Sequence, residues 1–327
     1  ALARAGDARQ AARLRAALGR AETATIAAPA LAALKIDLCP LIKPRLRLSD
    51  PDGIALGARI LSAAGTELPP ASPCVAAMSD LFKTVTVSGS LRAELLRTLA
   101  IVSPSVVRHL ALGALGDSDP HVRAAGAETF ARPGGGRPSL YRLQPLLKDV
   151  SPEVRAAAAA GMIRACGDLA DEYVLPLFKA RESEPLAAMA PELGKLSSAG
   201  SLDLLAKMAK RNNPELRIPV LAALAARQDA AGRALYQPAA LLVKKDPYAS
   251  AEARRIVYAT ADVNELVPLM KDPALGLMAF KALLRAQRHP EAMDWLVGSF
   301  DRLPPETLID AFGAWLGNPP ARPAAKP

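Results

Sequence analysis

The chain has 327 residues, of which 51% are hydrophobic and 22% are charged, and its formal net charge at pH 7 is +9. This balance excludes an intrinsically disordered chain, and the length predicts either two domains or one elongated repeat array. Aromatic residues make up only 4%, so the core must be built from Ala, Leu and Val, whose small side chains favour closely packed helices.

The first 48 residues are expected to form a helical N-terminal cap with a basic surface. Positions 1–50 hold nine basic and four acidic residues. Six of the basic residues are the candidates for binding: Arg9, Arg13, Arg20, Lys43, Arg45 and Arg47. The first three are predicted to share one helical face. We expect an acidic protein partner here, while an anionic membrane surface, a nucleic acid or a merely solvated face are the alternatives.

No membrane-spanning segment is predicted. The longest apolar stretch, 23–34, contains a proline and is shorter than the roughly 20 residues that a spanning helix needs. The chain starts with alanine rather than methionine, as it would after removal of a signal peptide or after shortening.

Two of the three cysteines are candidates for a disulfide. Cys39 and Cys74 each adjoin a proline in a predicted loop, whereas Cys166 lies in a predicted helix and is expected to be a free thiol. A bridge between the first two would close a loop worth about 3–4 kcal/mol in the chain-entropy model. Two free thiols in a reducing compartment are the alternative. The bridge would favour a periplasmic or exported location over the cytoplasm.

The segment KTVTVSG at 83–89 has the alternation of a short strand, which could pair with RLRL at 45–48. The end of a helix entering a turn fits the same residues, and this second interpretation is the one predicted.

A short phrase recurs between residues 49 and 316. It reads DSDPHVRAAGA at 117–127, DVSPEVRAAAA at 149–159 and RNNPELR at 211–217, with a copy from Ser88 that lacks the proline. Counting weaker copies, the prolines fall at positions 120, 152, 185, 214, 247, 273 and 305. The residue before each of the clearest prolines can cap a helix, and proline suits the first helical position. A second apolar helix is expected between successive phrases, so each unit is a helix pair that must stack on its neighbours.

This phrase resembles the HEAT repeat, and in particular the short bacterial HEAT-like repeats named after phycobilisome lyases. The matching residues are Val122 with Arg123, Val154 with Arg155, and the variant that ends at Arg217. The resemblance implies an all-α solenoid, here of about seven to nine stacked helix pairs over 49–316, with a concave surface that often holds another protein. Residues 317–327 are expected to form a Pro/Ala-rich tail. Such a scaffold does not specify a function.

Arg123, Arg155 and Arg217 recur at one position of the phrase. They could form a basic ladder for an anionic ligand. The prediction preferred here is structural, because arginines at such positions pair with loop acids, for which Asp117 and Asp149 are the candidates.

The sequence lacks the motifs of several enzyme classes. It has no C-x-x-C, no H-E-x-x-H and no G-x-S-x-G, and RPGGGRP at 132–138 lacks the ending of a phosphate-binding loop. The His-Glu pairs that bind iron in the HEAT-like deoxyhypusine hydroxylases are also missing. We therefore expect a noncatalytic scaffold or adaptor without a cofactor, possibly a subunit of a larger assembly. A lyase-like factor that attaches a chromophore or cofactor is the alternative, as is a nucleic-acid-binding HEAT protein, which the shortage of aromatic residues disfavours.

Overall fold

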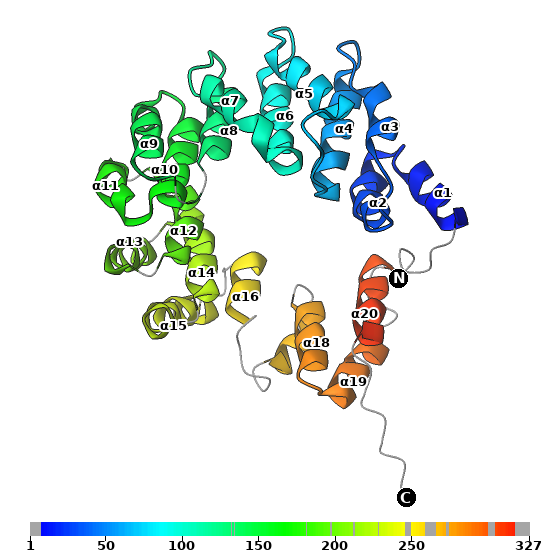
Figure 1. The fold of residues 1–327 in the computed structure, drawn as a ribbon. Helices are drawn as coiled ribbons and strands as arrows, with labels where there is room; N and C mark the ends of the chain where they lie inside the picture. Colours follow the sequence, from blue (N-terminus) through cyan, green and yellow to red (C-terminus); the bar gives the residue numbers. More distant parts are fainter. Residues whose placement is uncertain are drawn as a thin grey trace, which may run out of the picture. The chain divides into compact units, whose positions relative to one another are not determined.

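The computed structural model describes residues 8–131, 133, 135–180, 182–196, 198–211, 213–227, 229–245, 250–258, 266–272, 275–299 and 305–317. In this part of the chain every regular element is a helix, and successive helices pack against their neighbours in sequence order (Figure 1). The predicted all-α, solenoid-like fold is confirmed. The chain divides into two compact units, Ala1–Glu192 and Leu193–Pro327, and this division falls inside one helix of the array predicted over 49–316.

The helices of the first unit are mostly between 8 and 15 residues long. They are α1 (Ala8–Ala17), α2 (Ala21–Ala33), α3 (Cys39–Ile42), η2 (Lys43–Arg45), α4 (Pro51–Ala64), α5 (Pro73–Lys83), α6 (Gly89–Val102), α7 (Pro104–Ala114), α8 (Pro120–Phe130), α9 (Gly136–Leu143), η3 (Gln144–Lys148), α10 (Pro152–Cys166), η4 (Gly167–Ala170) and α11 (Asp171–Ala180). Helix α12 (Ser183–Lys195) begins in this unit and ends in the second.

Within the first unit, alternate helices form a continuous row. Helix α4 packs on α6, α6 on α8, and α8 on α10, while α5, α7 and α9 each pack against the following helix of the row (Figure 1). The helix pairs expected from the repeated phrase are therefore present. Helix α2 packs on α4 in the same manner, so the row begins within the 1–48 segment.

Prolines begin helices where the phrase predicts them. Asp119 caps α8, because its carboxylate accepts a hydrogen bond from a backbone N–H in the first turn. Of the prolines of the phrase, Pro120, Pro152, Pro214 and Pro305 stand at the first position of an α-helix, and α4, α5 and α7 also begin with a proline. Pro185 lies in the first turn of α12, and Pro247 and Pro273 lie outside the described residues. Local capping chemistry thus sets most of these helix starts.

Neighbouring helices of the row approach each other closely because small residues face one another. A Cβ atom placed on Gly161 in α10 would lie 2.8 Å from the Cβ of Ala131 and 3.1 Å from the carbonyl oxygen of Ala127 in α8. Five consecutive alanines of α10, 156–160, are buried. The high alanine content therefore permits close helix packing, as the composition indicated.

Residues 83–89 confirm the second of the two interpretations. Helix α5 ends at Lys83, a turn follows, and α6 begins at Gly89. Residues 45–48 lie at the end of η2 and in the turn before α4, so the pairing of two strands is wrong.

The second unit is also built from helices that pack against their neighbours along the chain. Its elements are α13 (Ala199–Ala209), α14 (Pro214–Ala226), α15 (Ala230–Lys245), α16 (Ala251–Tyr258), η5 (Pro268–Lys271), α18 (Gly276–Arg285), α19 (His289–Ser299) and α20 (Pro305–Gly317). Phe280 and Trp295 stack at 4.9 Å, and the indole N–H of Trp295 donates to the carbonyl oxygen of Met270 at 2.6 Å. The tail predicted over 317–327 lies outside the described residues, apart from Gly317.

Candidate functional site

Arg20 does not belong to the helix that contains Arg9 and Arg13, so the prediction that these three arginines share one helical face is wrong. Helix α1 ends at Ala17, and Arg20 lies before the first residue of α2 with extended backbone angles. The break contains Gly19, a residue that lowers helix propensity. Arg13 and Arg20 are exposed. Arg9 lies in α1, but its side chain is outside the described part of the structure.

The other three candidates lie together just before α4. Lys43 and Arg45 belong to η2, and Arg47 follows in the turn. Lys43 and Arg47 are exposed and Arg45 is half-buried. Among the described residues, none of these three side chains forms an ion pair with an acid. The N-terminal segment therefore presents cations whose charge is not neutralised by neighbouring carboxylates.

The arginines of the repeats have a different environment. Arg123 donates from Nε and Nη2 to both carboxylate oxygens of Asp149 at 2.8 Å, and from Nη1 to the carbonyl oxygens of Asp117 and Ser118 at 2.9 Å. The carboxylate of Asp149 also accepts the N–H of Ser151. Hydrogen bonds from Arg123 lower the pKa of Asp149. Arg123 thus joins the loop before its own helix, α8, to the loop before α10, which is the next helix of the row.

The same contact recurs in adjacent repeats. Arg155 donates to Glu182 at 2.6 Å and to the carbonyl oxygens of Asp149 and Val150. Arg92, in the copy without a proline, pairs with Asp117 at 2.5 Å. Arg217 lies half-buried in α14 of the second unit. We call the three pairs Arg92–Asp117, Arg123–Asp149 and Arg155–Glu182 the arginine ladder.

A second set of pairs links helices of the row. Arg97 of α6 bonds to Glu128 of α8 at 2.6 Å. Arg164 of α10 bonds to Glu192 of α12 at 2.9 Å and donates to the carbonyl oxygen of Glu128 at 3.2 Å. Like the arginines of the ladder, Arg97 and Arg164 hold neighbouring helices together.

The predicted disulfide is present. Cys39 and Cys74 are bonded, with Cα atoms 5.7 Å apart, and both are buried. The bridge ties the first turn of α3 to the first turn of α5. It therefore attaches the N-terminal segment to the first helix pair. Cys166 is free, as predicted.

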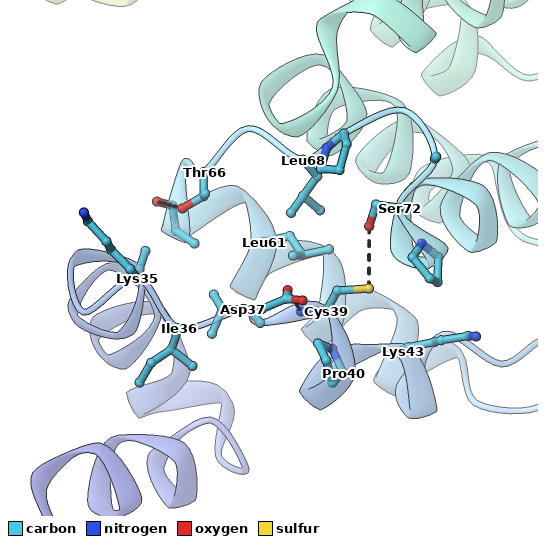
Figure 2. A pocket seen from close by; sticks show the side chains of 16 residues that line it. Lys35, Ile36, Asp37, Cys39, Pro40, Lys43, Leu61, Thr66, Leu68 and Ser72 are labelled. Atoms are coloured by element: carbon cyan, nitrogen blue, oxygen red, sulfur yellow. Dashed lines mark hydrogen bonds between the residues drawn. The ribbon is translucent and has the colours of Figure 1, made fainter. Parts of the chain in front are cut away.

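A pocket of about 770 Å³ lies beside this disulfide. Its walls come from three places: residues 32–43, the last turns of α4 and the loop 66–73 that leads to α5. The apolar lining includes Ile36, Leu38, Leu61, Leu68 and Pro69. Figure 2 shows Cys39 near the middle of this lining, with Ser72 above it. The pocket is thus an apolar hollow. The disulfide links one wall segment, 32–43, to the start of α5, which follows the loop of another wall segment.

Charged groups stand around the pocket. Lys35 and Lys43 lie on opposite sides of it, and Asp37 lies between them (Figure 2). The carboxylate of Asp37 accepts the backbone N–H of Cys39 at 2.9 Å, whereas neither lysine forms an ion pair within the described structure. Lys35 follows the end of α2 with a φ of 57°, a conformation that is more usual for glycine or asparagine. The surroundings of the pocket carry a net positive charge.

Sequence reasoning identified Lys43 but not the pocket. Its lining residues come from segments up to about 40 positions apart, and no periodic pattern marks them. Arg92 was also missed, although the Leu-Arg pair in the copy from Ser88 matches the Leu-Arg that ends at Arg217. That signal could have been found by aligning the copies on arginine rather than on proline.

The environment of Cys166 disfavours a reactive thiolate. Burial raises the pKa of its thiol, which donates to the carbonyl oxygen of Gly136 at 3.1 Å. Within the described ranges, no three His, Cys, Asp or Glu side chains are grouped to hold a metal ion. No described helix combines the length and the hydrophobicity needed to cross a bilayer.

No protein-family model matches the chain, and no curated protein matches it either.

Proposed function

We propose that this chain is a noncatalytic HEAT-type repeat protein that holds an acidic protein partner through its N-terminal segment. One observation carries the proposal. The basic residues Lys43 and Arg47 are exposed without an ion pair, whereas the arginines of the ladder are paired with acids. Cations already bonded to carboxylates contribute little to attracting a ligand, while unpaired ones steer an acidic partner toward the surface that bears them.

The disulfide supports an exported or periplasmic location for this function. Disulfides persist in oxidising compartments and are rare in the cytosol. The bridge between Cys39 and Cys74 fixes η2 and the basic turn after it to the first helix pair, so the proposed binding surface is rigid. A rigid surface loses less conformational entropy when a partner binds.

Charge reversal tests the proposal directly. We expect Lys43→Glu/Arg47→Glu to abolish capture of the partner from an extract of the native source, with the partner identified by mass spectrometry. The matched control is Lys83→Glu/Arg108→Glu, which changes the net charge equally at two exposed cations outside the segment. With the purified partner, the affinity of the wild-type protein should fall as salt rises.

Two outcomes would contradict the proposal. If both double variants capture the partner equally, the N-terminal cations do not form the binding surface. If the purified protein shows visible absorbance from a bound chromophore, or salt-dependent retention on DNA, one of the alternative functions is favoured instead.

A further inference from the structure

We propose that the pocket beside the disulfide binds a small amphipathic molecule that carries a carboxylate on an apolar body. The pocket shares Lys43 with the proposed partner-binding surface, but the proposal of a small-molecule ligand does not rest on the protein partner. Three features of the pocket lead to the proposal: its size, its apolar lining and the charge around it.

The size of the pocket fits a whole small molecule. Its volume of about 770 Å³ falls in the range of roughly 300–1,000 Å³ that encloses drug-sized ligands. The lining is mainly aliphatic, with Leu61 from α4, Leu68 from the following loop and Ile36 from the segment after α2. Burial of an apolar body against these side chains supplies the main driving force for binding.

The wall of the pocket is fixed before any ligand arrives. Cys39 lines the pocket, and its disulfide joins the segment before η2 to the start of α5. The N–H of Leu68 also donates to the carbonyl oxygen of Val102 at 2.6 Å, which holds the covering loop against α6. A preformed site avoids the entropy cost of ordering loops on binding.

Charge selects the head group of the ligand. Lys35 and Lys43 are unpaired within the described structure, while the one carboxylate at the pocket, that of Asp37, already accepts a backbone N–H. The two ammonium groups outnumber the single carboxylate, so an anionic head group is favoured over a cationic one. Either ammonium group can attract a carboxylate at the edge of the pocket while the apolar body lies against the aliphatic lining.

The experiment uses the full chain and three ten-carbon probes with different head groups: decanoate, decanol and decyltrimethylammonium. We expect calorimetric titration to show saturable binding of decanoate at one site, weaker binding of decanol and the weakest binding of the cation. In Lys35→Asn/Lys43→Gln, the Kd for decanoate should rise about 2- to 5-fold, the range that one exposed charge contact supplies. The Kd for decanol should stay unchanged. Asparagine at position 35 keeps the positive φ accessible, so this variant should fold normally.

A second pair of variants locates the site. Ala71→Trp adds a large side chain at an exposed position of the pocket lining and should weaken binding of both decanoate and decanol. Ala76→Trp makes the same change on α5 outside the lining, and Lys83→Gln removes a lysine away from the pocket. Both of these controls should bind decanoate as the wild type does.

Three results would overturn the proposal. Absence of saturable decanoate binding would show that the pocket takes no such ligand. Equal affinity for decanoate and decyltrimethylammonium would show that the lysines do not select the head group. Undiminished binding in Ala71→Trp would place the ligand elsewhere on the chain.

Discussion

Arg123 in the repeats and Arg47 in the N-terminal segment carry the same charge in opposite surroundings. Arg123 bonds to two carboxylate oxygens and two carbonyl oxygens, and its side chain is 14% exposed. Arg47 is exposed and has no ion pair among the described residues. The first contributes to stability because its removal leaves the largely buried carboxylate of Asp149 without its main donor, while the second is available to another molecule. The residues around a basic side chain therefore determine whether it stabilises the fold or is available to bind another molecule.

The largest expected effect concerns the link between these two regions. Cys39→Ser/Cys74→Ser should lower the free energy of unfolding by about 3–4 kcal/mol, because the unfolded chain regains the freedom that the closed loop removes. Chemical denaturation measures this loss. A reducing agent should destabilise the wild-type protein similarly and leave the double variant unaffected. If neither the reducing agent nor the double substitution shifts the midpoint of chemical denaturation away from that of the untreated wild-type protein, the N-terminal segment is held to the repeats by packing alone.

The next effect separates the two kinds of arginine. Arg123→Ala should cost about 2–3 kcal/mol, because it removes charge-assisted hydrogen bonds and leaves Asp149 largely buried without its main donor. Arg47→Ala should cost less than about 0.5 kcal/mol, as exposed substitutions usually do. Urea unfolding of both variants gives the comparison. Equal losses of unfolding free energy in the two variants would show that ion pairing does not make Arg123 more important for stability than Arg47.

A smaller effect depends on pH. The pKa of Asp149 is lower in the folded protein than its ordinary value, chiefly because Arg123 donates hydrogen bonds to it. The stability from this pair is therefore fully present above the unfolded-state pKa of about 4 and is lost as pH falls through the lower folded-state pKa. The difference in stability between wild type and Arg123→Ala should narrow as pH falls below about 4. In Arg47→Ala the small difference should not change with pH in this range.

The sequence predicted the parts of the structure that depend on local chemistry. Pro120 and Asp119 sit next to each other in the chain, so the start of α8 could be predicted from them. The prolines beside Cys39 and Cys74 likewise led to the disulfide, although both cysteines lie in the first turns of helices and not in the predicted loops. The helix break before Arg20 was missed, although Gly19 offered a signal. The pocket could not be predicted, because its walls meet only when α2, α4 and the loop before α5 have packed.

The arginine ladder also has a consequence for how such a chain can change in evolution. Each arginine reaches an acid only 25 to 27 residues further along the chain, which is close to the length of one repeat. The arginine and the acid of each pair therefore lie in adjacent copies of the same phrase. Deleting or duplicating one whole repeat between Arg92 and Glu182 would place an arginine opposite an equivalent acid again. The array can lengthen or shorten by one copy without losing the arginine–acid pairs on either side. The reason is that the stability of such arrays is a sum of contributions from each repeat and from each interface between neighbouring repeats.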